Sequence, residues 1–179
     1  VKDVSVIIVA TQSFENTSPP HNARLQHLLG LPTSVLCFDM VEACNGFIKG
    51  LAVADSLLSM GQKALIVTGE VNSLTTQKAE MSLKVLLADG FSFSLVEKEA
   101  EKARSLIHTD GSRGDALRMS LHPPLAYMDG LEVFSFTHSE VPKLVKEADW
   151  INREDKDQIF AFHQANGYIV NRIGKKLGL

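Results

Sequence analysis

The stretch VSVIIVA at residues 4–10 is a continuous apolar run dominated by β-branched side chains. Such a run is typical of a strand that is buried on both faces of a parallel or mixed sheet. A polar segment with the paired prolines Pro19 and Pro20 ends the run, and residues 21–29 then carry apolar side chains at helical spacing until Gly30. The stretch therefore predicts the opening strand and helix of a layered α/β fold.

Working outward from this strand, strand and helix patterns alternate to the end of the chain. Apolar runs predict further strands at residues 34–38, 64–68, 91–96 and 158–162. Apolar spacings of three and four predict helices at residues 44–60, 132–148 and 167–177. Pro142 is expected to make the second of these helices irregular. A charged stretch at residues 97–104 divides the chain into residues 1–97 and 98–179, where a boundary between two lobes is expected.

The composition narrows the classes of function. The chain has 179 residues, 45% of them hydrophobic and 22% charged, and a formal net charge of −3, which does not suggest a nucleic-acid surface or a polybasic membrane patch. No apolar run approaches the roughly 20 residues of a membrane span, and no leader resembles a signal peptide, so we expect a cytoplasmic protein. The two cysteines, Cys37 and Cys44, are expected to be free thiols, and the spacing of the six histidines predicts no metal site.

Cys44 is the first candidate for chemistry, because a turn of small residues places it at the start of the expected helix 44–60. The unpaired N–H groups and the macrodipole of a helix start favour an anion, so a thiolate is stabilised there. Capture of an acyl group as a thioester is the chemistry that such a thiolate performs. The alternative is a buried structural cysteine that packs among alanine and phenylalanine side chains.

His163 is the second candidate, because it directly follows the expected strand 158–162 and leads into the last helix. Open α/β sheets place working groups in this position, beyond the ends of strands. An imidazole there can polarise a thioester carbonyl or hold a thiolate, depending on its protonation. The alternative is a histidine whose nitrogens are satisfied by backbone partners.

The two ends of the chain suggest a piece of a larger fold. Val1 is not an initiator methionine, and the first strand begins almost at once. The far end stops directly after a helix that closes on Gly178. We therefore expect the α/β fold to be incomplete at both ends.

Five segments carry a resemblance to a known family. In chain order they are VIIVAT at residues 6–11, DMVEACNGF at 39–47, ADG at 88–90, MDGLEVF at 128–134 and HQAN at 163–166. Together they resemble β-ketoacyl-acyl-carrier-protein synthase III, a condensing enzyme of the thiolase fold. The resemblance implies a thiolase-like layered αβαβα fold, with residues 1–97 as a partial N-terminal half that carries the cysteine and residues 98–179 as a partial C-terminal half that carries the histidine.

The resemblance also implies a reaction and its residues. Cys44 would accept the acyl group, and His163 would assist decarboxylation of a malonyl thioester and stabilise the enolate. The stretch that would bind the carrier protein consists of Gln164, Ala165, Asn166, Gly167 and Tyr168. The implied acyltransferase is a homodimer that initiates fatty acid synthesis from acyl-coenzyme A and malonyl-acyl-carrier protein, with no cofactor.

Three departures from the family pattern leave alternatives open. The family's third catalytic group, an asparagine on a Gly-Asn-Thr-Ser-like loop, its glycine-rich C-terminal strand and its N-terminal helix and strand have no counterpart in residues 1–179. Tyr168 stands where the family usually has a basic residue, and Ser18 precedes Pro19 where a bulky aromatic residue is common, which predicts a wider acyl pocket. A non-catalytic dimerisation or partner-binding module of the same fold therefore remains an alternative, as does another thioester-condensing enzyme of specialised metabolism.

Overall fold

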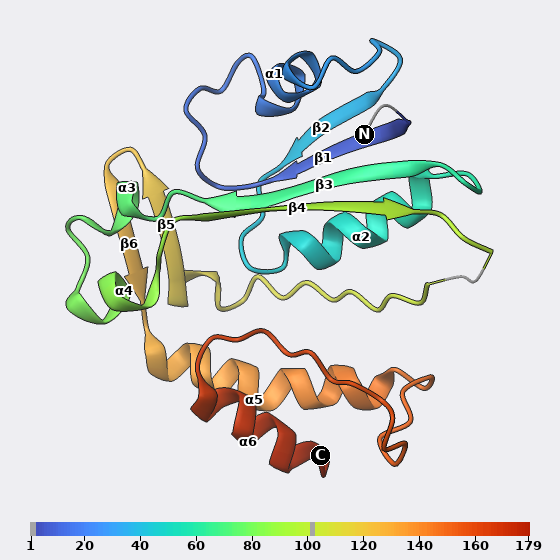
Figure 1. The fold of residues 1–179 in the computed structure, drawn as a ribbon. Helices are drawn as coiled ribbons and strands as arrows, with labels where there is room; N and C mark the ends of the chain where they lie inside the picture. Colours follow the sequence, from blue (N-terminus) through green and yellow to red (C-terminus); the bar gives the residue numbers. More distant parts are fainter. Residues whose placement is uncertain (1–2, 101–102) are drawn as a thin grey trace.

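The computed structural model describes residues 3–100 and 103–179, apart from the side chain of residue 121. Its strands are β1 (Val4–Ala10), β2 (Leu36–Met40), β3 (Lys63–Glu70), β4 (Gly90–Glu97), β5 (Leu117–Leu121) and β6 (Pro124–Met128). Its α-helices are α1 (His21–Leu28), α2 (Gly46–Leu57), α3 (Ser73–Thr76), α4 (Met81–Leu86), α5 (Gly130–Glu147) and α6 (Gly167–Leu177). Figure 1 shows a sheet with α1 on one face and α2 on the other, and the α5–α6 pair below. The predicted α/β class is confirmed.

The main sheet has four strands in the order β2-β1-β3-β4. Strand β1 is parallel to both of its neighbours, so Ile8 lies between Phe38 of β2 and Ile66 of β3. Strand β4 runs antiparallel to β3. This arrangement agrees with the continuous apolar run of β1, since a central strand is covered by other elements on both faces.

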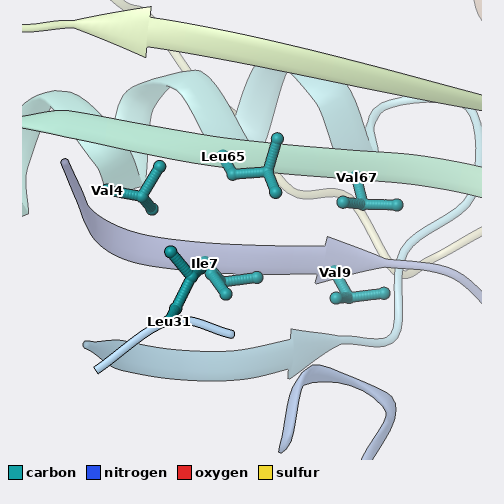
Figure 2. Close-up of a cluster of buried hydrophobic side chains, with 6 residues drawn as sticks. All are labelled: Val4, Ile7, Val9, Leu31, Leu65 and Val67. Atoms are coloured by element: carbon teal, nitrogen blue, oxygen red, sulfur yellow. The ribbon is translucent and has the colours of Figure 1, made fainter. Parts of the chain in front are cut away.

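Two separate apolar cores hold the sheet between its helices. On the α1 face, the core consists of Val4, Ile7, Val9, Leu31, Leu65 and Val67 (Figure 2). On the α2 face, it consists of Val6, Ile8, Ala54, Leu58, Ala64 and Ile66. The alternation of neighbouring residues between the two lists follows from the two-residue period of a strand.

One apolar stripe of the sheet is left uncovered. Phe91, Phe93 and Leu95 of β4 are 61%, 64% and 52% exposed. They pair with alternate residues of β3 from Gly69 to Leu65, which places them on the α1 face. Helix α1 makes its main contacts with β2 and β1, on the far side of the sheet from β4, so it leaves this stripe exposed. The sequence predicted β4 correctly but not this exposure.

The segment 158–162 was predicted to be a strand, and this prediction is wrong. It has no strand partner among the described residues, and Ile159 is 90% exposed. An apolar run becomes a strand only when a neighbouring strand supplies its backbone hydrogen bonds. The hairpin of β5 and β6 was not predicted, because its strands are short and β6 begins with a proline, which is uncommon within a strand.

Helices α5 and α6 pack against each other, and Pro142 explains one of their contacts. Pro142 is fully buried inside α5 and has no N–H to give to the carbonyl oxygen of His138, four residues earlier. Lys176 of α6 donates its ammonium group to that carbonyl instead, at 2.8 Å. The His138 carbonyl that Pro142 leaves without a donor in α5 thus accepts a hydrogen bond from α6.

The boundary between two lobes at residues 97–98 stays a prediction. Of the charged stretch on which it rests, residues 101–102 lie outside the described residues. No helix in the part of the chain that the structure describes is long and apolar enough to cross a membrane.

Candidate active site

Cys44 lies in the turn between β2 and α2, with an exposed side chain. The helix was expected to begin at Cys44, but it begins at Gly46, with Asn45 as its N-cap. Cys44 is therefore one residue before the cap, near the N–H groups that a helix start leaves unpaired. The exposure contradicts the alternative of a buried structural cysteine and leaves the thiol open to a substrate.

Two glycines fix the turn that carries Cys44 against the sheet. A Cβ atom at Gly46 would lie 2.8 Å from Cβ of Ala10, and one at Gly50 would lie 3.1 Å from Cγ2 of Ile66. Both distances are shorter than an ordinary carbon–carbon contact of about 3.5–4.0 Å. The first turns of α2 therefore lie directly on β1 and β3. The signal for this contact, two glycines four residues apart, was present in the sequence but was not used.

An ion pair closes the same turn. Lys49 in α2 donates to the carboxylate of Glu42, which precedes Cys44 by two residues. Each of these side chains is 25% exposed, so the pair is partly shielded from water. The pair ties the start of the turn to the body of the helix and so restrains the Cys44 segment.

A carboxylate at the end of β3 organises the neighbouring loop. Glu70 accepts hydrogen bonds from the backbone N–H of Gln12 at 2.8 Å and from the hydroxyl of Ser13 at 2.6 Å. The Ser13 hydroxyl oxygen in turn accepts from the N–H of Val71 at 2.9 Å. Gln12 and Ser13 follow the carboxyl end of β1, and Glu70 is the last residue of β3. The parallel strand β2 ends at the same edge of the sheet and leads to Cys44. Sequence reasoning missed Glu70 because its partners lie more than fifty residues away.

Asp39, the first residue of the cysteine motif, has a structural role. Its carboxylate accepts hydrogen bonds from the backbone N–H groups of His21 at 2.8 Å and of Asn22 at 2.9 Å, which are the first residues of α1. The side chain of Asn22 adds a third bond at 2.8 Å. A carboxylate that caps a helix start is stabilised by the unpaired N–H groups there. Asp39 therefore joins β2 to α1 at the edge where Cys44 lies.

His163 lies in the exposed segment that precedes α6. Among the described residues, no hydrogen bond or ion pair joins its imidazole to Cys44 or to any other side chain. In Figure 1, α2 and α6 both run from left to right, and the two candidates belong to the segments that lead into these helices. In the described part of the chain, the structure therefore does not join the two side chains by a hydrogen bond.

The residues after His163 form the start of α6. Asn166 is the N-cap, and its side-chain oxygen accepts a hydrogen bond from the N–H of Ile169 at 2.9 Å. Gln164 donates to the carbonyl of Phe162 at 3.0 Å, and Gly167 is the first helical residue. Ala165, between them, is half-buried.

Tyr168 is 62% exposed, and the guanidinium of Arg172 lies over its ring, 5.6 Å from the ring centroid. The ring of Phe134 in α5 lies 5.6 Å from the same aromatic ring. A cation one helical turn after Tyr168 therefore occupies the neighbourhood where the family pattern led us to expect a basic residue. Arg172 was not singled out from the sequence, although its spacing from Tyr168 was readable.

The other thiol is less suited to act as a nucleophile. Cys37 is half-buried in β2 and lies 3.5 Å from the carbonyl oxygen of Val35. Burial raises the pKa of the Cys37 thiol, because the interior disfavours the charged thiolate. Within the described residues, no group of three or more histidine, cysteine, aspartate or glutamate side chains is placed to hold a metal ion.

Comparison with known proteins finds similar sequences and similar folds. A family model described as 3-oxoacyl-[acyl-carrier-protein] synthase III matches residues 38–113. The β-ketoacyl-[acyl-carrier-protein] synthase III proteins of Streptococcus gordonii and Streptococcus uberis are 33% and 35% identical, over 99% and 98% of this chain. The chain spans 60% of the length of each of these relatives.

Solved structures agree with the sequence relatives. The synthase III of Thermus thermophilus superposes with a TM-score of 0.85 at 29% identity, over 99% of this chain and 60% of that one. The priming β-ketosynthase of the R1128 polyketide pathway superposes with a TM-score of 0.84 at 26% identity, over 99% of this chain and 58% of that one. The resemblance stated from the sequence and the thiolase-like fold are both confirmed.

Proposed function

We propose that this chain is part of a β-ketoacyl-[acyl-carrier-protein] synthase III, the type of enzyme that it matches over nearly its whole length, and that Cys44 accepts the acyl group. One observation carries the proposal. Cys44 is an exposed thiol at the start of α2, held at the carboxyl edge of the sheet by glycine contacts and by the Glu42–Lys49 pair. The proposed activity is acyl transfer followed by decarboxylative condensation, as in the initiation of fatty acid synthesis.

The first step is transfer of the acyl group to the thiol. The thiolate of Cys44 attacks the carbonyl carbon of an acyl-coenzyme A thioester, and the bond from that carbon to the coenzyme sulfur breaks. Coenzyme A leaves as a thiolate and takes up a proton. One thioester replaces another, so the step is nearly balanced in free energy.

The second step forms the carbon–carbon bond. A malonyl thioester on the carrier protein loses carbon dioxide, and the electron pair of the broken bond becomes an enolate. The enolate carbon attacks the acyl carbonyl on Cys44, and the cysteine sulfur leaves as a thiolate. In this proposal, the His163 imidazole donates a hydrogen bond to the enolate oxygen, which stabilises charge as an oxyanion hole does.

The start of α6 is the proposed contact for the carrier protein. Gln164, Ala165, Asn166 and Gly167 precede or open the helix, and Tyr168 follows them with Arg172 over its ring. A guanidinium recognises phosphate through paired hydrogen bonds, so Arg172 is suited to the phosphate of a carrier prosthetic group. We further propose that the protein is a cytoplasmic homodimer, and the free thiols of Cys37 and Cys44 support a reducing compartment.

A non-catalytic module of the same fold is the second candidate, and one observation favours it. Among the described residues, no hydrogen bond joins the side chains of Cys44 and His163, and the segment before His163 has no strand partner. Such a module predicts that Cys44 can be alkylated by general reagents but is not acylated by thioesters.

Intact-mass spectrometry of the chain after exposure to a panel of acyl-coenzyme A thioesters separates the two candidates. We expect a mass gain of one acyl group in the wild type and in Cys37→Ala, and none in Cys44→Ala. An unchanged mass gain in Cys44→Ala would refute the proposed nucleophile. The second step is tested separately by adding malonyl-acyl-carrier protein to the acylated chain. We expect the wild type to release the acyl group and His163→Ala to retain it.

A further inference from the structure

The end of β1 is bonded to the part of the chain that leads to Cys44. We call residues 10–13 the β1 end segment. The carbonyl oxygen of Met40, the last residue of β2, accepts hydrogen bonds from the N–H of Thr11 at 3.1 Å and from the N–H of Glu42 at 3.0 Å. The first bond comes from the neighbouring strand and the second from the turn itself. Both lone pairs of this oxygen are then in use, so the chain leaves β2 in a defined direction.

The β1 end segment also supports the turn on the far side of the cysteine. Gly46 is buried, and a Cβ atom there would lie 2.8 Å from Cβ of Ala10. The N–H of Gly46 donates to the carbonyl oxygen of Ala43 at 2.9 Å, which closes the backbone around Cys44. The β1 end segment therefore contacts the Cys44 turn both before and after the thiol.

Glu70 holds the β1 end segment from β3, the strand on the other side of β1. Its Oε1 accepts a hydrogen bond from the N–H of Gln12 at 2.8 Å. Its Oε2 accepts from the hydroxyl groups of Ser13 at 2.6 Å and of Thr11 at 3.4 Å. Within the described part of the chain, no lysine, arginine or histidine pairs with this carboxylate. Both of its oxygens are therefore engaged by neutral donors of the β1 end segment.

We propose that Glu70 is a positioning residue for Cys44 and acts on the thiol through the β1 end segment. This inference rests on the proposed function, in which Cys44 accepts the acyl group. A thiolate attacks a carbonyl carbon productively only from a narrow range of positions, and a misplacement of about 1 Å can slow such a step about a hundredfold. Glu70 restricts that range because it fixes the segment that contacts both ends of the turn.

The hydrogen bonds of Glu70, and not its negative charge, are what this role requires. Glu70→Gln keeps the length of the side chain. Its amide oxygen can still accept from the N–H of Gln12, and its amide nitrogen can donate to the hydroxyl oxygen of Ser13. Glu70→Ala removes both contacts. Asp89→Ala is the matched control, because the Asp89 carboxylate accepts from the N–H and the hydroxyl of Ser73, at 2.8 Å each, outside the β1 end segment.

Hydrogen–deuterium exchange resolved by NMR tests the positioning without any acyl transfer. The N–H groups of Glu42 and Gly46 donate to carbonyl oxygens and not to Glu70. We expect Glu70→Ala to speed their exchange about tenfold, and Glu70→Gln and Asp89→Ala to change it by less than about twofold. An effect of Glu70→Ala confined to the N–H of Gln12, or an equal effect throughout α5, would overturn the proposal.

Single-turnover acylation by an acyl-coenzyme A tests the consequence for the reaction. We expect Glu70→Ala to lower the maximum rate of Cys44 acylation about tenfold to a hundredfold and to leave the half-saturating concentration unchanged. Glu70→Gln should recover most of the rate. Alkylation of Cys44 by iodoacetamide needs no fixed orientation and should change less than about twofold in either variant, as should alkylation of Cys37.

Two results of these rate measurements would overturn the positioning role. One is an equal slowing of acylation and alkylation of Cys44, and the other is an equal loss of acylation in Glu70→Gln and Glu70→Ala. A wild type that is alkylated at Cys44 but never acylated would refute the proposed function instead. The exchange of the Glu42 and Gly46 amides would then still decide whether Glu70 positions the turn.

Discussion

Gly46→Ala tests the close contact between α2 and β1. The new Cβ atom would be 2.8 Å from Cβ of Ala10, which is about 0.7–1.2 Å inside an ordinary carbon–carbon contact. Ala10 belongs to a central strand and is 2% exposed, so its methyl group has no free space into which to move. Overpacking of this kind costs about 1–3 kcal/mol, and the better helix propensity of alanine returns up to about 1 kcal/mol.

The net expectation is a loss of about 1–2 kcal/mol in the free energy of unfolding. For a chain of this size, that corresponds to a fall of about 2–8 °C in the melting temperature. Urea unfolding followed by circular dichroism measures the first quantity, and thermal unfolding measures the second. Gly174→Ala in α6 is the matched control, because its Cβ would meet no atom within 4 Å, and it is expected to stabilise the protein.

The double variant Ala10→Gly/Gly46→Ala separates a steric clash from a general effect of the substitution. Removal of the Ala10 methyl group leaves the new Cβ free of its closest neighbour. Gly46→Ala is therefore expected to cost nothing in the Ala10→Gly background, with a coupling free energy of about 1 kcal/mol or more. An equal cost in both backgrounds would refute the steric explanation.

Three further predictions concern the caps and bonds of other elements. Asn166→Ala removes the N-cap of α6 and is expected to cost about 0.5–2 kcal/mol in urea unfolding, whereas Asn166→Asp retains the acceptor and its stability; equal losses would contradict the cap. Lys176→Met is expected to lower the free energy of unfolding by about 0.5–1.5 kcal/mol. The loss should be smaller in a Pro142→Ala background, because the N–H of the substituted residue can then donate to the His138 carbonyl. An equal loss in both backgrounds would contradict the idea that Lys176 replaces the missing N–H donor. Hydrogen bonds from the backbone N–H and then the hydroxyl of Ser73 lower the pKa of Asp89, so its stabilising contribution is present above the unfolded value of about 3.9 and is lost as the pH falls through the folded value. Asp89→Asn is therefore expected to lower the urea midpoint at pH 7 but not at pH 2, and an equal loss at both would contradict the role of the charge.

The elements that the sequence predicted well share one property. The strand β1 and the helices α2 and α5 each show an apolar pattern that reflects contacts with several other elements. Such patterns are local and can be read without knowing the partners. The order of strands and the division of the core between two faces of the sheet required the structure.

The errors have physical reasons that lie outside the local pattern. The segment 158–162 has the apolar character of a strand but no neighbouring strand among the described residues, and backbone pairing cannot be read from one segment alone. The helix start was placed two residues early because Asn45 as a cap was not considered. For the candidate site, the motifs singled out Cys44 and the Asn166 segment, whose roles stay predictions, while Glu70 and Arg172 became visible only through their contacts.

The bond from Lys176 to the His138 carbonyl has a consequence for the order in which the chain acquires protection from solvent exchange. Without α6, α5 keeps an unpaired carbonyl above its buried proline, so neither helix is complete alone. Their amide protons should then exchange with deuterium together, as one cooperative unit of opening, although residues 148–166, which contain no helix or strand, separate them in the sequence. Helix α6 thus completes the hydrogen bonding of α5 only after it has been synthesised. In nascent chains that lack α6, the amide protons of α5 would be only partly protected from exchange.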